Sequence, residues 1–147
     1  MEAFVQIFNR DLEKLALEIE SFKKDENLWK TQGAISNSAG NLCLHLIGNL
    51  NHFIGEVIGK SGYVRDREAE FNDKDVDKGQ LLKMILETKG VVASTINKFD
   101  KEKLRSYYPI NLFGDPMTYE FLIIHLTTHL SYHLGQINYL RRILDKG

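Results

Sequence analysis

Residues 125–136 read HLTTHLSYHLGQ and hold three of the chain's five histidines, His125, His129 and His133, at intervals of four. On an α-helix, a four-residue step turns a side chain by only about 40° and moves it about 6 Å along the axis. Neighbouring members of the series can therefore present both imidazoles to one metal ion. His125 and His133 would lie about 12 Å apart along the axis, too far for one ion with bonds of about 2.1 Å. The spacing predicts a ligand pair, either His125 with His129 or His129 with His133.

This stretch belongs to one of four long segments that are free of proline beyond their first turn, because the only prolines are Pro109 and Pro116. Apolar residues recur at steps of three and four through the first three of these segments, as on the buried face of an α-helix. Long segments without proline favour helix over strand. We therefore expect four helices, over residues 3–24, 38–59, 77–99 and 115–145.

Local signals mark the starts of three of these helices. Ser38 is a suitable N-cap for the second helix, since its hydroxyl can accept a hydrogen bond from a free backbone N–H. Asp77 and Gln80 have the spacing of a capping box at the start of the third. Asp115 followed by Pro116 predicts the start of the fourth, because proline fits the first helical position.

The three connections, over residues 25–37, 60–76 and 100–114, exceed the shortest helix-hairpin loops. Helices that are neighbours in the sequence therefore need not be antiparallel. The sequence contains no repeat, low-complexity tract or interdomain linker, and 147 residues is an ordinary length for one domain. We predict an all-α fold, a single four-helix-bundle domain over residues 1–147.

Composition narrows the function classes. The net charge is -1 and there is no strongly basic block, so we expect no nucleic-acid partner. No apolar run approaches the roughly 20 residues of a membrane span, and the N-terminus lacks a signal-peptide pattern, so we expect no membrane partner and a cytoplasmic location. The single cysteine, Cys43, excludes an internal disulfide and fits a reducing compartment. We expect it to be a buried apolar filler.

A third metal ligand is expected from the second helix, which holds the other two histidines, His45 and His52. These are seven residues apart, so they share a face but are separated by about 10 Å, and only one can join a given ion. Asn49 lies between them on that face. The spacing thus predicts a three-histidine metal site between the second and fourth helices, with both choices open. The alternatives are hydrogen-bonded histidines at the core edge, or a histidine series that lines a dimer interface.

Three stretches carry a resemblance to a known family. The fourth segment has the pattern H-x3-H-x3-H-x-G-Q, which ends at Gly135 and Gln136 and is followed by INYLRRIL. Residues 37–55 read NSAGNLCLHLIGNLNHFIG, with a histidine in an apolar HL context, and residues 65–71 read RDREAEF. Together they resemble the DinB-like superfamily over about residues 28–144. The most specific part is the H-x3-H-x-G-Q unit combined with the histidine of the second helix.

The resemblance implies a four-helix bundle in up-down-down-up order, with a long crossover between the second and third helices. It also implies a divalent metal, most often zinc or nickel, held by His45, His129 and His133, with His52 and His125 lining the surroundings of the site. Members of the superfamily are commonly homodimers. Characterised relatives include bacillithiol S-transferases and mycothiol-dependent maleylpyruvate isomerase, which use a low-molecular-weight thiol.

Three ligands leave a coordination position for water or a substrate thiolate, whereas structural zinc is usually closed by four protein ligands. The first hypothesis is therefore a metal-dependent enzyme with a small-molecule substrate, of the thiol-cofactor S-transferase kind. The alternative is a non-catalytic metal- or ligand-binding helical bundle. A metal ion with a free coordination position, next to a cleft, would favour the enzyme hypothesis. A fourth protein ligand on the ion would favour the non-catalytic bundle.

Several polar residues are candidates for a role beside the ion. Gln136 and Asn49 can hydrogen-bond a ligand imidazole, a metal-bound water or the cofactor. Arg65 can pair with a carboxylate of the thiol or substrate, if the crossover brings it to the mouth of the site. The rest of the mixed-charge run at 65–70 is expected to be solvated, and Gly135 is expected to allow close helix approach.

Overall fold

The computed structural model describes residues 1–146, which form helices and their connections without any β-strand. Long helices are α1 (Glu2–Glu20), α2 (Ala39–Leu50), α4 (Lys78–Ile96) and α6 (Tyr119–Leu144). Shorter elements lie between them, namely η1 (Asp25–Trp29), the π-helical turn η2 (Asn51–Glu56), α3 (Arg67–Asn72) and α5 (Lys101–Arg105). The predicted all-α fold is confirmed.

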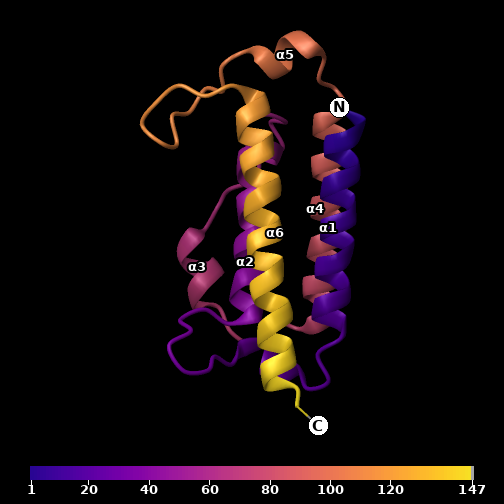
Figure 1. Ribbon diagram of the computed structural model, residues 1–147, viewed down its shortest axis with the longest axis vertical. Coiled ribbons are helices and arrows are strands. Elements are labelled where there is room, and N and C mark those ends of the chain that lie inside the picture. Colours follow the sequence, from indigo (N-terminus) through magenta and orange to yellow (C-terminus); the bar gives the residue numbers. More distant parts are fainter. Residues whose placement is uncertain (147) are drawn as a thin grey trace.

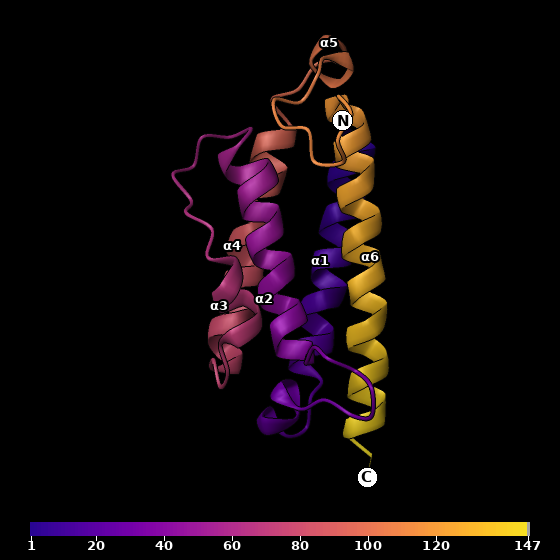
Figure 2. The ribbon, with the colours of Figure 1, turned by 90° about the vertical axis from the view of Figure 1, so that its left-hand side faces the viewer.

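The four long helices form a bundle in which each packs against two others. α1 contacts α4 and α6, and α2 contacts the same two helices from the opposite corner. Figures 1 and 2 show that α1 and α6 run in one direction, whereas α2 and α4 run in the other. The order is therefore up-down-down-up, and the chain must return along the whole bundle between α2 and α4, as predicted.

Burial differs between the helices in the way their sequences require. α1 has one apolar face, so that Phe8, Leu12, Leu15 and Ile19 are buried, while all of its charged residues except Asp11 remain at least partly exposed. Every residue of α2 is buried, because α3 and η1 cover the side that α4 and α6 leave open. Within residues 1–146, no helix has both the length and the apolar character that crossing a membrane requires.

Two of the three predicted helix starts are confirmed by their caps. The Ser38 hydroxyl accepts a hydrogen bond from the Asn41 backbone N–H at 3.2 Å. The Asp77 carboxylate accepts one from the Gln80 N–H, also at 3.2 Å. Each cap of this kind stabilises a helix by about 1 kcal/mol, since it satisfies a donor that the helix cannot.

The predicted start of the last helix is wrong. α6 begins at Tyr119, with Thr118 as its N-cap, rather than at the Asp115–Pro116 pair. The segment before Thr118 is extended, because the Tyr108 N–H donates to Met117 O and the Tyr119 N–H donates to Ser106 O. These two hydrogen bonds hold the backbone just before Thr118 in an extended conformation, so the helix cannot begin at Asp115 although the Asp-Pro pair there favours it.

The crossover between α2 and α4 is not a plain loop. After η2 the chain returns along the outside of α2 and forms α3, which packs on α2 (Figure 2). Asp66 caps α3 by accepting from the Ala69 N–H at 3.0 Å. The crossover thus places residues 65–72 over the middle of α2, opposite the side that faces α6.

Candidate metal centre

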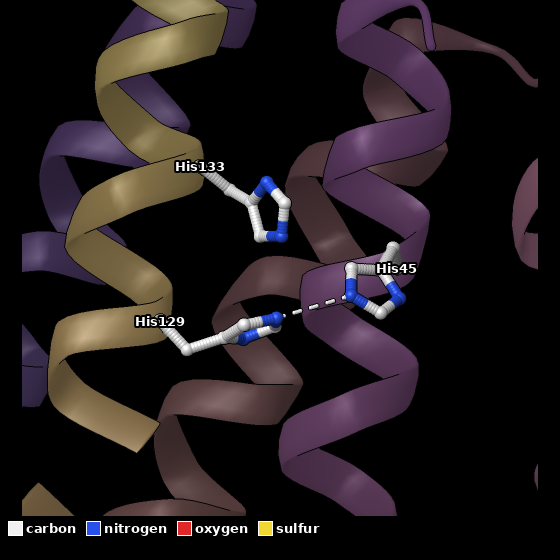
Figure 3. A group of neighbouring side chains, drawn as sticks. All are labelled: His45, His129 and His133. Atoms are coloured by element: carbon white, nitrogen blue, oxygen red, sulfur yellow. Dashed lines mark hydrogen bonds between the residues drawn. The ribbon is translucent and has the colours of Figure 1, made fainter. Parts of the chain in front are cut away.

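Four of the five histidines lie on α2 and α6, which are neighbours in the bundle, and His52 lies in η2, directly after α2. Three of them meet: the ligand nitrogens of His45, His129 and His133 all lie within 4.8 Å of one another. His45 comes from α2, and the other two come from consecutive turns of α6 (Figure 3). These are the ligands that the family resemblance implies, selected from the alternatives that the spacing left open.

The distances between the rings suit a common ion. His45 Nε2 and His129 Nε2 are 3.2 Å apart. Two nitrogens bound tetrahedrally to one zinc ion with bonds of about 2.0–2.1 Å lie about 3.3 Å apart. The His133 ring centre lies 5.2 Å from that of His45 and 4.6 Å from that of His129. The three side chains together could therefore hold a metal ion.

The His45 ring is fixed from behind by a carboxylate. His45 Nδ1 lies 3.0 Å from Glu70 Oε1, and since a carboxylate only accepts, Nδ1 carries the proton. That tautomer leaves the lone pair of Nε2 directed at the other two rings. Both residues are buried, with 7% of His45 and 5% of Glu70 exposed. Carboxylate–histidine pairs of this kind orient metal ligands and increase their basicity.

Arg65 completes this arrangement. Its Nε and Nη2 atoms donate to the two oxygens of Glu70, each at 2.8 Å, in a fork that matches the carboxylate. Burial alone would raise the pKa of the Glu70 carboxyl, but the hydrogen bonds from Arg65 and His45 outweigh it and lower that pKa. Glu70 is therefore an anion that balances one guanidinium and supports one imidazole.

The surface of α2 is shaped to receive Glu70. A Cβ atom at Gly48 would lie 2.6 Å from Cδ of Glu70, so only glycine leaves room for this carboxylate. One turn before His45, Asn41 donates from Nδ2 to the backbone carbonyls of Glu70 and Asp73, at 3.0 and 2.8 Å. Asn41, His45 and Gly48 thus form one stripe of α2 on which α3 is docked.

His133 is supported differently. Its Nδ1 donates to Gln136 Oε1 at 2.7 Å, which again places the proton on Nδ1 and frees Nε2. Burial is the main cause of a lowered pKa at His133, although the contact with Gln136 acts in the opposite direction. Gln136 is an exposed residue one turn further along α6, so this support lies at the surface. The predicted role of Gln136 beside a ligand imidazole agrees with this geometry.

His129 lies deepest in the α6 pair. Burial first, and then the neighbouring imidazoles of His133 and His45, lower its pKa to about 4. It is therefore neutral at physiological pH, the form that a metal ligand requires.

His129 Nδ1 is buried without a hydrogen-bond partner within residues 1–146. Asn49, with 7% of its surface exposed, likewise has a buried Oδ1 without a partner there. The structure thus leaves two buried polar atoms, His129 Nδ1 and Asn49 Oδ1, without a hydrogen-bond partner in this part of the chain.

A protein family described as "Protein of unknown function (DUF1572)" matches residues 5–147. The chain belongs to this family. No curated protein matches its sequence. Among solved structures it is similar to one described as "Crystal structure of the conserved protein of locus from Enterococcus faecalis", with a TM-score of 0.76 and 15% identity over 97% of this chain and 95% of that one. At this identity the likeness concerns the fold alone.

In this DUF1572-family chain, the remaining predicted residues lie outside the three-histidine group. His125 stacks on His129 with ring centres 6.1 Å apart, and it also contacts Phe113, with ring centres 4.8 Å apart. His52 contacts Phe53, and burial lowers its pKa. Cys43 is fully buried, which raises the pKa of its thiol to about 12, so it is a core residue as predicted.

Three interpretations of polar or small residues need correction. Arg65 does not stand at the mouth of the site to receive a ligand carboxylate, because Glu70 occupies its fork. The mixed-charge run at 65–70 is not solvated throughout, since Glu70 is buried. Gly135 does not permit close helix approach, because a Cβ there would meet nothing within 4 Å.

Sequence reasoning missed Glu70, Asn41 and Gly48 as parts of the site. A signal was present on α2, where Asn41 and Gly48 stand four before and three after His45 in a largely apolar helix. Such a stripe of a polar residue, a histidine and a glycine indicates that something other than a hydrophobic helix packs there. Its partner could not be identified from spacing, since Glu70 is 25 residues further along the chain.

Proposed function

We propose that this chain binds one divalent transition-metal ion, zinc or nickel, through Nε2 of His45, His129 and His133, and that it is a metal-dependent enzyme acting on a small molecule. The observation that supports this is the convergence of three imidazoles from two helices, with the Nδ1 atoms of two of them already engaged elsewhere. Imidazole nitrogen suits both metals.

The number of ligands supports a reactive ion over a purely structural one. Within residues 1–146, the group of histidine, cysteine and carboxylate side chains that converge here has three members, and structural zinc sites usually have four. When bound, a divalent ion with an open position supplies Lewis-acid chemistry and lowers the pKa of a thiol or water that coordinates there. A non-catalytic bundle remains the alternative hypothesis.

The chain's own residues would contribute position and protonation state. Glu70 and Gln136 keep the protons of His45 and His133 on Nδ1, so both rings present lone pairs inward. The low pKa of His129 means that its ring loses no proton when a ligand bond forms at neutral pH. An arrangement that is oriented and neutral in advance reduces the free-energy cost of binding the ion.

The reaction class within this proposal is S-transfer from a low-molecular-weight thiol, on the strength of the H-x3-H-x-G-Q pattern and the RDREAEF stretch that resemble DinB-like proteins. Membership of the DinB-like superfamily is part of the same proposal. A thiol that coordinates the ion becomes a thiolate, which is the nucleophilic form. The cofactor, substrate and metal are each open to direct measurement.

We also propose that the chain forms a homodimer. Phe113, Phe121 and Ile124 are large apolar residues that are about half exposed near the start of α6. Phe113 and Phe121 contact each other with ring centres 6.3 Å apart, so they form a continuous apolar patch. Patches of this kind on a soluble protein often mark an interaction surface.

Metal content of purified, untagged protein tests the site. Wild type should carry about one ion per chain, and His129→Ala should carry almost none, because it removes one of three ligands, whose Nε2 lies 3.2 Å from that of His45. His125→Ala is the matched control: the same substitution one turn away on α6, at a histidine outside the group, should retain the ion. Equal metal content in the two variants would refute the ligand assignment.

Activity requires a separate measurement. Metal-loaded protein should catalyse the reaction of a small thiol with a small electrophile, and His129→Ala should lose that turnover while His125→Ala keeps it. A protein that binds stoichiometric metal but shows no turnover with any thiol tested would support the non-catalytic alternative and contradict the enzyme proposal.

A further inference from the structure

A pocket of about 470 Å³ lies beside the candidate metal centre, on the side towards the C-terminal end of α6. The segment between η1 and α2 crosses towards the end of α6 and forms one wall (Figure 2). The start of α2 and three turns of α6, over residues 132–143, form the other walls. Volumes of this size are typical of small-molecule sites. Its apolar lining consists chiefly of Ile35, Leu42, Tyr132, Tyr139, Leu140 and Ile143.

The pocket and the metal centre share two residues. His133 and Gln136 line the pocket, and they are also joined by the hydrogen bond that orients the His133 ring. Because Gln136 uses Oε1 for that bond, its amide NH₂ group is available to donate to a molecule in the pocket. Ser36 and Asn37 provide further polar groups on the opposite wall. A ligand that fills the pocket is therefore in contact with a ligand of the ion.

The side chains of the lining favour an uncharged occupant. None of the residues that line the pocket is Asp, Glu, Lys or Arg. Arg142 lies over the ring of Tyr139 at 5.6 Å and is not part of the lining. Arg65, which could have met a carboxylate near the ion, is engaged by Glu70. A carboxylate or sulfonate placed in this pocket away from the ion would lose part of its hydration, and no side chain of the lining would supply a counter-charge.

Two tyrosines favour an aromatic occupant. Tyr132 and Tyr139 are seven residues apart and so lie on one face of α6, and each is largely exposed at the pocket. Aromatic side chains bind aromatic molecules through offset or edge-to-face contacts, worth about 0.5–1.5 kcal/mol beyond the area they bury. Exposed tyrosines that line an uncharged pocket are thus better suited to a flat apolar ring than to a flexible polar chain.

We propose that this pocket binds the uncharged aromatic body of the small-molecule substrate, with a hydrogen-bond acceptor next to the Gln136 amide. This rests on the proposed function and extends it, since it assigns the pocket to the apolar co-substrate rather than to the anionic thiol. The thiol must then approach the ion from a different side.

A pair of fluorescent probes tests the proposal with metal-loaded protein. N-phenyl-1-naphthylamine is neutral, and 1-anilinonaphthalene-8-sulfonate has the same two aromatic groups with a sulfonate added. The neutral probe should bind with a stoichiometry of about one per chain, and the anionic probe at least about fivefold more weakly. Equal or tighter binding of the sulfonate would overturn the assignment to an uncharged ligand.

Substitutions locate the bound probe. Ile35→Asp places a carboxylate on the pocket wall and should weaken the neutral probe about tenfold or more. Ile110→Asp is the matched control, because Ile110 has a similar exposed fraction (37% against 41% for Ile35) and is not part of the lining. Equal binding to both variants would place the probe elsewhere and refute the proposal.

Two further readouts separate this inference from the proposed function. Metal content and turnover are measured on the same samples, so wild-type protein that holds the ion but does not bind the neutral probe contradicts the pocket assignment alone. Probe binding with no bound metal contradicts the proposed function alone. If the neutral probe is displaced as protein concentration rises and dimers form, a second copy of the chain covers the pocket, and the proposal is overturned.

Discussion

The two sides of the metal centre are built differently. On the α2 side, His45 is buried and its Nδ1 is held by a carboxylate that is itself held by an arginine fork. On the α6 side, His133 is held by the amide of Gln136, an exposed residue of the same helix. A buried carboxylate should fix an imidazole ring more firmly than an exposed amide does. Hydrogen bonds to ionised groups are stronger, and at a buried position water does not compete for them.

This difference separates two tasks. On the α2 side, Glu70 lies in direct contact with His45 Nδ1, at 3.0 Å, and fills the space above Gly48. The α6 side borders the pocket through His133 and Gln136. We infer that α2 and α3 set the position of the ion, while α6 presents it to a ligand. The long crossover is then needed because it brings Arg65 and Glu70 back over α2.

The largest effect is expected from Glu70→Leu. It leaves the Arg65 guanidinium without a counter-charge at a largely buried position, which should lower the free energy of unfolding by about 3 kcal/mol. Loss of the support for His45 should weaken metal binding about 10- to 100-fold. Urea denaturation and competition with a chelator measure the two quantities.

Glu68→Leu is the control for that substitution. Glu68 is an exposed residue of the same short helix, so its loss should change stability by no more than about 0.5 kcal/mol and leave metal affinity unchanged. If both variants bind metal as the wild type does, the carboxylate has no role in holding the ion, and the two sides of the centre do not differ.

A smaller effect is expected from Gly48→Ala. The added methyl group must displace Glu70 from α2, which should cost about 1–3 kcal/mol of stability and weaken metal binding in the same direction as Glu70→Leu. Gly90→Ala on α4 has nothing within 4 Å of the new Cβ and should stabilise the protein by about 0.5–1 kcal/mol, the ordinary gain of alanine in a helix. The geometry therefore requires that Gly48→Ala lower the free energy of unfolding and that Gly90→Ala raise it.

The helix starts show how far the fold could be predicted from the sequence. Helical periodicity and the caps at Ser38 and Asp77 predicted the long helices because those signals are local. The same local argument failed at Asp115, where pairing between Tyr108 and Met117 fixes the backbone instead. Local chemistry can propose a helix start, but a hydrogen bond from a neighbouring segment decides whether it is used.

The candidate site, like the helix starts, could be predicted only where the signal in the sequence is local. Four-residue spacing on α6 predicted that His129 shares an ion with an adjacent histidine, and a family resemblance was needed to prefer His133 and His45. Nothing in the spacing of the predicted second helix distinguishes His45 from His52, because the choice depends on how far that helix and α6 are shifted along each other. Glu70 was missed for a related reason: it reaches His45 only through the path of the crossover.

The smallest effect is expected from Gln136→Leu, which tests the weaker side of the comparison. It removes the acceptor of the His133 Nδ1–H at an exposed position, where water can take over the hydrogen bond. Metal affinity should therefore fall only about 2- to 5-fold, and stability should change by about 0.5 kcal/mol or less. Gln136→Glu keeps an acceptor at the same place and should retain wild-type affinity. A loss with Gln136→Leu as large as that with Glu70→Leu would mean that both rings depend equally on their supports, and the division between an anchoring side and a ligand-facing side would have to be abandoned.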